Sequence, residues 1–334
     1  MKLSEIALFV RSRPFILVSS LSLLLVWSLW LLQLGPGYAF ANLFRHWAIA
    51  LTMFFGSIVA GGTSMGGGVV AFPVMTKALA IPPQEAKVFS LAIQTIGMGA
   101  ASLTIIALGT QLPWAFIRFA SLGGIVGMWL GTVVFAPLLS ASIIRFTFTI
   151  VLSSFAVALI LWGRRRRIRL VISYWNHQSR IIAIVTGIVG GIASGLVGTG
   201  IDIVAFSVLV LMFNLCEKVS TPTSVILMAI NAAAGFFIHC CVLSDFTPIV
   251  QQYWFAAIPV VVLGAPAGAI ACSYLSRQKI VMLLVGLIAL ELSSSLLLIP
   301  LSGSLAGFGI IVFLIFLFLY YAMHKMSGTL QRCP

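Results

Sequence analysis

Charged residues are scarce in this sequence, and this scarcity limits the possible folds more than any motif does. They make up 7% of the 334 residues, whereas hydrophobic residues make up 61%. A soluble domain carries about 25% charged residues, which it needs to cover its surface. Most of this surface must therefore face lipid, and the lipid bilayer is the predicted environment of the fold. The composition excludes a soluble enzyme and a disordered chain.

Twelve apolar runs, separated by turn signals such as Gly-Pro-Gly at 35–37, predict an all-α polytopic membrane protein with about 12 helical segments. A membrane span needs about 20 apolar residues. Two runs, 68–82 and 202–216, have only 15 residues, which indicates short broken helices. The other runs are 15–34, 46–63, 87–109, 113–139, 141–162, 181–198, 221–243, 250–275, 279–299 and 304–324.

The basic residues predict the orientation. The net charge of +13 comes from residues that lie between the apolar runs, so we expect no nucleic-acid partner. If all twelve runs cross, 15 of the 19 Lys and Arg residues share the side of the basic stretch 163–180 and 4 lie opposite. Positive residues favour the cytoplasm, which predicts a multi-pass protein of the cell inner (plasma) membrane with both termini cytoplasmic. The first run resembles a signal peptide, but its 20 residues exceed the usual 7–15, so we expect an uncleaved helix.

An internal repeat divides the chain. Aligned without gaps, residues 56–73 and 190–207 share seven identical positions. After a three-residue insertion, Ala-Ile-Gln at 92–94 matches Ala-Ile-Asn at 229–231, and Gly-x-x-x-Gly at 127–131 matches 264–268. Each copy spans five runs, an odd number, so we predict two inverted five-segment repeats, as in many secondary transporters. The predicted parts are an N-terminal helix with its connection (1–44), the first repeat (45–162), a cytoplasmic basic loop (163–180), the second repeat (181–299) and a C-terminal helix with a tail (300–334).

A glycine cluster precedes or opens the short run in each copy. Glycine lets the backbone unwind, and lipid tolerates unwound backbone only where it lines a cavity. Free N–H groups and the positive end of a helix dipole then favour an anion. Glycines can also merely allow close helix packing, which is our interpretation of the Gly-x-x-x-Gly pairs. The predicted substrate-binding residues are Thr63, Ser64, Gly66, Gly67, Gly68, Gln94, Thr199, Gly200 and Asn231.

Two of the six acidic residues, Asp202 and Glu291, lie within apolar runs. A charge at the membrane centre costs at least about 2.5–3.5 kcal/mol, so such residues usually have a function. We interpret both as candidate proton-coupling residues. Asp202 also fits an N-cap of the run that follows it, and Glu291 also fits a neutral, hydrogen-bonded acid beside the serines at 293–295. Asp245 is expected in a loop and His239 as a packed neutral imidazole.

The motif GTSMGGGVVAFP at 62–73, its weaker copy GLVGTGIDIVAF at 195–206 and the central basic loop resemble the sulfite exporter TauE/SafE family of membrane permeases. The resemblance covers residues 45–300. It implies a carrier for sulfite, sulfonates or related sulfur-containing or organic anions. Asp202 departs from the family pattern, in which Gly is usual at this position.

These features predict a secondary transporter that moves a small anion by alternating access, coupled to a proton or ion gradient because no nucleotide-binding motif is present. An anion channel and a membrane-embedded enzyme are the alternatives. Residues 62–66 match the GxSxG hydrolase motif, but they lie between apolar helices, so we expect no enzyme. The cysteines show no metal-binding spacing. We expect no metal or other cofactor, and homo-oligomerisation stays open.

Overall fold

The computed structural model describes residues 14–66, 74–163, 168–172, 175–298 and 303–327, and every regular element in these ranges is a helix. The all-α prediction is therefore confirmed for this part of the chain. The first half contains α2 (Pro14–Leu34), α3 (Pro36–Arg45), α4 (Trp47–Gly62), η1 (Val74–Ala78), α6 (Pro83–Ala107), α7 (Trp114–Trp129) with its extensions η2 (Leu130–Phe135) and η3 (Ala136–Leu138), and α8 (Ala141–Trp162). The second half contains α9 (His177–Val197), α10 (Ile201–Leu211), α11 (Glu217–Phe237) with its extension η5 (Ile238–Val242), α12 (Pro248–Tyr274), α13 (Arg277–Leu298) and α14 (Gly303–Met326).

Nine of the described helices are long and apolar enough to cross a membrane, and the bent pair α3–α4 adds a tenth if it counts as one span. Twelve crossings were predicted, and the difference lies in the two short runs. α10 has 11 residues, so it rises about 16 Å, roughly half of a hydrocarbon core about 30 Å thick. The prediction of a short helix is confirmed there. Within the other short run, residues 74–78 form the π-helix η1.

One helix was not predicted. The Gly-Pro-Gly at 35–37 indicates a turn, yet α3 begins at Pro36 and continues to Arg45. Gly35 has a φ of +71°, which breaks the chain away from α2. Proline is well suited to a first helical turn, because its missing N–H has no partner to lose there. The same residues therefore end one helix and start the next, and α3 then meets α4 at 83°.

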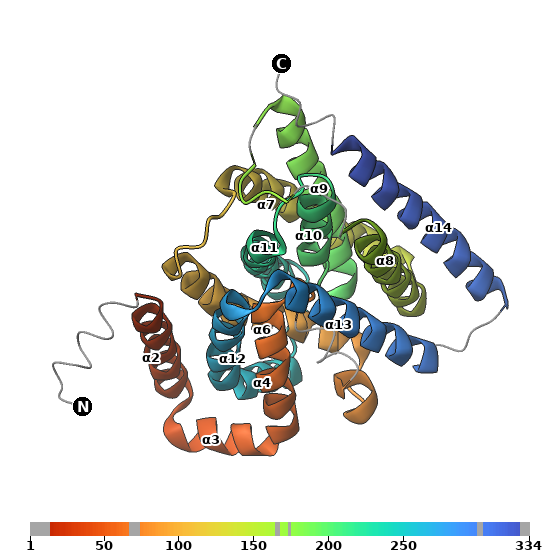
Figure 1. Ribbon diagram of the computed structural model, residues 1–334. Coiled ribbons are helices and arrows are strands. Elements are labelled where there is room, and N and C mark those ends of the chain that lie inside the picture. The colour runs from red at the N-terminus through yellow and green to blue at the C-terminus, as the bar shows by residue number, and fades with distance from the viewer. Residues whose placement is uncertain (1–13, 67–73, 164–167, 173–174, 299–302, 328–334) are drawn as a thin grey trace.

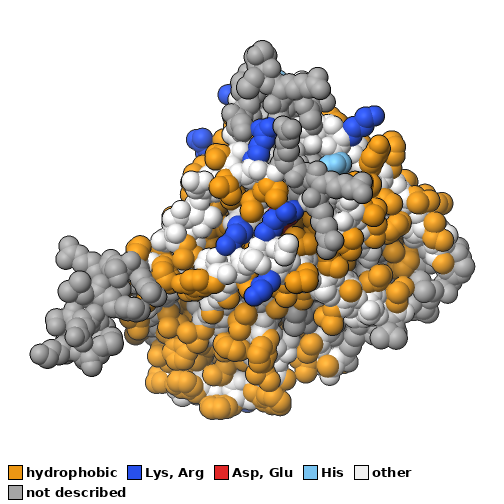
Figure 2. Space-filling model, viewed as in Figure 1, with side chains coloured by type: hydrophobic (Ala, Val, Ile, Leu, Met, Phe, Trp, Pro, Cys, Tyr) orange, Lys and Arg blue, Asp and Glu red, His pale blue; other side chains and the backbone are white. Residues whose placement is uncertain are grey.

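The helices at the edges of the bundle are the least buried. Figure 1 shows α2 and α14 at opposite edges, with α6, α11 and α12 between them. In the apolar windows of these helices, 72% of α12 and 67% of α6 are buried, against 6% of α2 and 11% of α14. Figure 2 shows hydrophobic side chains over much of the visible surface, interrupted by Lys and Arg in the upper and middle part of the view. So large an apolar surface needs lipid around it, and the chain is a multi-pass membrane protein.

The two repeats pack through equivalent contacts. A Cβ on Gly127 of α7 would overlap the carbonyl oxygen of Ile188 in α9. A Cβ on Gly264 of α12 would lie 2.7 Å from the carbonyl oxygen of Phe54 in α4. Position 127 aligns with 264, and position 188 with 54, so the contacts correspond. A second equivalent pair of contacts joins Gly131 to Ile192 and Gly268 to Ile58. The packing role of these glycines is confirmed, while the inverted direction of the repeats and the domain boundaries stay predictions.

Candidate anion-binding site

The first helix break follows α4. The helix ends at Gly62, and Thr63 takes an extended conformation while its hydroxyl donates to the carbonyl of Val59 at 2.8 Å. Ser64 donates a long hydrogen bond, 3.5 Å, to the hydroxyl of Thr221 on α11. Gly66 has a φ of +63°, a left-handed conformation that favours glycine. Gly67 and Gly68, also predicted in the site, lie outside the described residues.

The second break separates α9 from α10. Gly198 and Gly200 have φ values of +90° and +153°, so the chain turns out of one helix and into the next. The first N–H of α10, from Ile201, donates to the hydroxyl of Ser194 at 2.9 Å. A Cβ on Gly200 would lie 2.7 Å from the Cβ of Ala193, which leaves no room for a side chain. The glycines therefore produce the interruption that the sequence predicts.

The two breaks meet. A Cβ on Gly66 would lie 2.6 Å from Oγ1 of Thr199 and 2.9 Å from Oδ2 of Asp202. The first break therefore packs directly on the start of α10. Residues more than 130 positions apart in sequence come together at this point, as the repeat predicts. The polar members of the site (Thr63, Ser64, Gln94, Thr199, Asp202 and Asn231) are all at most 4% exposed.

Asp202 faces its own helix start. Its Oδ1 accepts the N–H of Ile203 at 3.0 Å, and Oδ2 accepts the hydroxyl of Thr199 at 3.2 Å. The N-cap position itself belongs to Gly200, so the alternative that made Asp202 the N-cap is wrong by position. A carboxylate in the first turn of a helix is stabilised by the helix dipole. Asp202 therefore already provides an anionic group at the positive end of α10.

Two amide side chains flank the second break. Nε2 of Gln94 on α6 donates to the carbonyl of Gly198 at 3.0 Å, and Asn231 on α11 lies with Ile201 against Gly124. Among the described residues, no hydrogen-bond partner is present for Oε1 of Gln94 or for either polar atom of the Asn231 side chain. An unsatisfied buried polar group costs about 1–3 kcal/mol. These amides, which align in the repeat, are thus suited to bind a polar ligand.

Glu291 lies apart from this arrangement. Its carboxylate accepts a hydrogen bond of 3.4 Å from Ser295, whose hydroxyl is 3.0 Å from that of Thr149 on α8. Arg145 of α8 is close enough to interact with the charge of Glu291. The structure therefore places Glu291 at the contact between α8 and α13 and gathers the other described site residues around the breaks.

Two cavities approach the breaks. The Lys218 cavity, about 260 Å³, is lined by residues that include Gly61, Thr110, Lys218 and Thr221. The Lys87 cavity, about 370 Å³, is lined by residues that include Gln84, Lys87, Arg145, Leu196 and Val197. The first reaches the end of α4 and the second reaches the end of α9. In the repeat alignment position 84 corresponds to 221, so the cavities occupy equivalent places.

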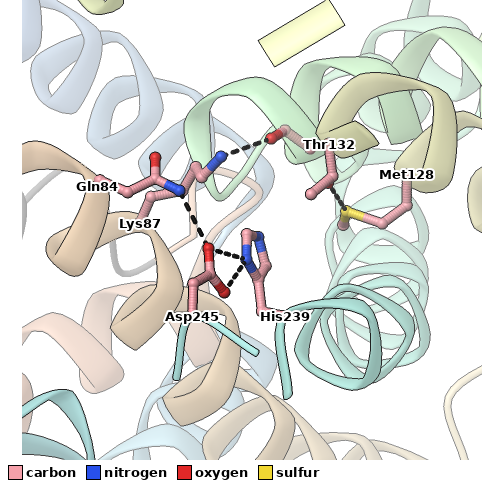
Figure 3. Close-up of polar contacts among 7 residues, drawn as sticks. Gln84, Lys87, Met128, Thr132, His239 and Asp245 are labelled. Atoms are coloured by element: carbon pink, nitrogen blue, oxygen red, sulfur yellow. Dashed lines mark hydrogen bonds and ion pairs between the residues drawn. The ribbon is translucent and has the colours of Figure 1, made fainter. Parts of the chain in front are cut away.

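Sequence reasoning missed a cluster of polar contacts beside the Lys87 cavity. Nδ1 of His239 lies 2.8 Å from Oδ1 of Asp245, and Gln84 donates to Oδ2 of Asp245 at 3.3 Å. Lys87 donates to the carbonyl of Gly195 in α9 at 3.3 Å, and Figure 3 shows these side chains grouped between α6, α9 and the end of α11. His239 and Asp245 are six residues apart on either side of a turn, a spacing that carries no recognised signal.

Comparison with known proteins gives one match. The family model described as Sulfite exporter TauE/SafE matches residues 49–294, which include both breaks and both amides. No curated protein and no solved structure matches the chain.

Proposed function

This chain belongs to the sulfite exporter TauE/SafE family of membrane transporters, and we propose that it carries a small sulfur-containing or organic anion, such as sulfite or a sulfonate, across the cell inner membrane. The observation that carries this proposal is the contact of Gly66 with Thr199 and Asp202. Two unwound segments meet there in a buried place, and lipid tolerates unwound backbone at membrane depth only where it is buried in protein or lines a cavity.

The groups around this contact suit an oxyanion. The amide nitrogen of Asn231 is a donor that has no partner among the described residues. The hydroxyls of Ser64 and Thr199 and the amide of Gln94 would donate to a ligand in place of their present partners, Thr221, Asp202 and Gly198. The helix dipole at the start of α10 adds positive potential, although the N–H groups of Ile201 and Ile203 already donate to Ser194 and Asp202. Asp202 opposes this while it is ionised, so binding requires that its carboxylate turns away or takes up a proton. Asp202 and Glu291 are accordingly our candidate groups for coupling to a proton.

Alternating access is supported by the pair of equivalent cavities. Contacts group the segments that the basic residues place in the cytoplasm: Arg169 bridges to Leu215, and Arg277 donates to the carbonyl of Gly163 at 2.7 Å. The Lys218 cavity lies with these segments, since Leu170 also lines it. We therefore assign the Lys218 cavity to the cytoplasmic side and the Lys87 cavity to the outer side. Rocking of one inverted repeat against the other would open each cavity in turn to the same site.

Transport by the purified protein in proteoliposomes tests this proposal. We expect saturable uptake of labelled sulfite. We also expect counterflow, in which unlabelled sulfite inside the proteoliposomes drives labelled sulfite inward. Flux without saturation or counterflow would instead indicate a channel, and chemical conversion of the anion would indicate an enzyme. If the flux shows neither saturation nor counterflow, the carrier proposal is wrong.

A matched pair of variants locates the site. Thr199 and Thr186 are both buried threonines, on the break and in the middle of α9, and Thr186 donates to the carbonyl of Ile182 at 2.6 Å. A hydrogen bond to a charged group contributes about 1.5–3 kcal/mol, so Thr199→Val should weaken sulfite affinity by about ten- to 150-fold. Thr186→Val should leave the affinity unchanged. Equal effects of the two substitutions would place the site elsewhere.

A further inference from the structure

The cluster beside the Lys87 cavity, formed by Gln84, Lys87, His239 and Asp245, is built around a buried imidazole. His239 is 0% exposed, and its Nδ1 lies 2.8 and 3.0 Å from the two carboxylate oxygens of Asp245. Among the described residues its Nε2 is buried and has no hydrogen-bond partner. A histidine packed only as an apolar ring would not need a carboxylate aligned on one nitrogen, and a fully satisfied one would not leave the other nitrogen open.

The backbone is arranged to hold Asp245 in this position. Ser244 has a φ of +54°, which is uncommon for a residue with a side chain, and the N–H of Asp245 then donates to the carbonyl of His239 at 3.1 Å. Gln84, at the start of α6, donates to the same carboxylate. Figure 3 shows the carboxylate of Asp245 between the side chains of Gln84 and His239. Three segments of the chain thus fix one ion-pair geometry.

The cluster has no counterpart in the other repeat. The positions that align with Lys87, His239 and Asp245 are Ser224, Ser102 and Leu108. The helix breaks, the amides and the cavities are all paired between the repeats, whereas this charge arrangement occurs on one side of the molecule. A charged cluster that occurs in one repeat only can make the two faces of the membrane functionally different. Helix packing alone does not require such a difference.

The cluster is also connected to the second break. Lys87 and Gln94 are seven residues apart on α6, so they lie on the same face of the helix. Lys87 donates to the carbonyl of Gly195, and Gln94 donates to the carbonyl of Gly198. Both bonds hold the last turn of α9, immediately before Thr199 and Asp202. The cluster is therefore joined through Lys87 to the turn that leads into the site.

We propose that His239, held by Asp245, is a proton-binding site whose occupancy controls anion affinity at the adjacent break, an inference that rests on the proposed anion transport. When the ring of His239 is neutral, the charges of Lys87 and Asp245 cancel. When the ring is protonated, the cluster carries one net positive charge. That charge attracts an anion. Because binding linkage is reciprocal, the bound anion also raises the affinity of His239 for the proton.

Other charges near the ring are few. Among the described residues, the charged groups that interact with the charge of His239 are Asp245, from the loop before α12, and Lys87, from α6. Arg145 of α8 lines the Lys87 cavity with Lys87. Met128 of α7, which lies against Gly235 of α11, and Thr132 of η2, which lies against Gly195 of α9, carry no charge. Within this cluster we assign the change of charge to the imidazole of His239.

Binding measured across pH tests this inference. We would use calorimetry on the full-length protein in nanodiscs with methanesulfonate, an anion whose charge is constant between pH 5.5 and 8.5, so that any change reports the protein. Linkage to one proton lowers the affinity by up to about tenfold per pH unit on the alkaline side. Asp202 and His239 each add to this dependence, so we expect it in full in the wild type and in His177→Asn, an exposed histidine at the start of α9. We expect it to be weaker in His239→Asn, whose amide can still donate to Asp245.

Each outcome is decisive. A weaker pH dependence in His239→Asn than in the wild type, with retained binding, supports the inference. An unchanged profile in His239→Asn, a flat profile in the wild type, or loss of pH dependence in Asp202→Asn instead of His239→Asn overturns it. If His239→Asn does not fold, Asp245→Asn serves in its place, and the affinity should then fall at a more acidic pH; an unmoved profile overturns the inference. Absence of binding by every anion at every pH would contradict the proposed transport function, and this inference with it.

Discussion

Replacing Gly66 with alanine tests the contact between the two helix breaks. A φ of +63° costs a residue with a side chain about 1–2 kcal/mol. The new Cβ would also lie 2.6 Å from Thr199 Oγ1 and 2.9 Å from Asp202 Oδ2, well inside van der Waals distance. Overpacking of this kind costs about 1–3 kcal/mol. We therefore expect Gly66→Ala to cost about 2–5 kcal/mol in total, of which about 1–3 kcal/mol arises at the second break.

Gly109 provides a matched control. It has a φ of +70°, and a Cβ there would meet nothing within 4 Å. Gly109→Ala should therefore carry the backbone cost without the contact, so the difference between the variants isolates the contact. If that difference is expressed at the site, Gly66→Ala weakens sulfite affinity by about five- to 150-fold, whereas Gly109→Ala lowers only stability.

The assay combines thermal unfolding with calorimetric sulfite binding, both on protein in nanodiscs. Unfolding gives the change in stability for each variant, and calorimetry gives the change in affinity. Wild-type sulfite affinity in Gly66→Ala, or an equal loss in the two variants, would refute the reasoning that the breaks form a common site.

Two further predictions concern the rest of the bundle. Arg277→Gln should destabilise the protein by about 3–5 kcal/mol in thermal or denaturant unfolding, because the guanidinium donates at 2.6 Å to Glu217, which is fully buried. Lys279→Gln, a substitution of an exposed residue, is the control. An equal small effect of the two substitutions would contradict this prediction. In a background without native cysteines, a membrane-impermeant thiol reagent should label Gln84→Cys from the outside and Thr110→Cys from the cytoplasm, and labelling of both from one face would refute the assignment of the cavities.

The sequence predicts most of the framework because lipid imposes strong rules. A helix must be apolar along its length, so the run at 141–162 coincides with α8 (Ala141–Trp162), and the run at 87–109 lies within a few residues of α6 (Pro83–Ala107). Glycine is the residue that tolerates the φ values at 198 and 200, so the sequence also predicts the break between α9 and α10. The internal repeat then predicts that the two breaks lie together.

What escaped prediction depends on tertiary contacts or on ambiguous signals. A Gly-Pro pair ends a helix or starts one, and only the structure shows that Pro36 does the second. Arg277 and Glu217 are 60 residues apart, and nothing local relates them. The pairing of His239 with Asp245 depends on the backbone turn at Ser244, which a composition-based interpretation treats as an ordinary loop. Charged pairs were thus harder to predict than apolar spans.

An experimental structure of the protein with sulfite in nanodiscs tests the account most directly. We predict density for one anion at the junction of the two breaks, within hydrogen-bond distance of Thr199 and of the amides of Gln94 and Asn231. Density at the surface or in the lipid-facing grooves, with α4 and α10 unchanged and no ligand between them, would contradict the account.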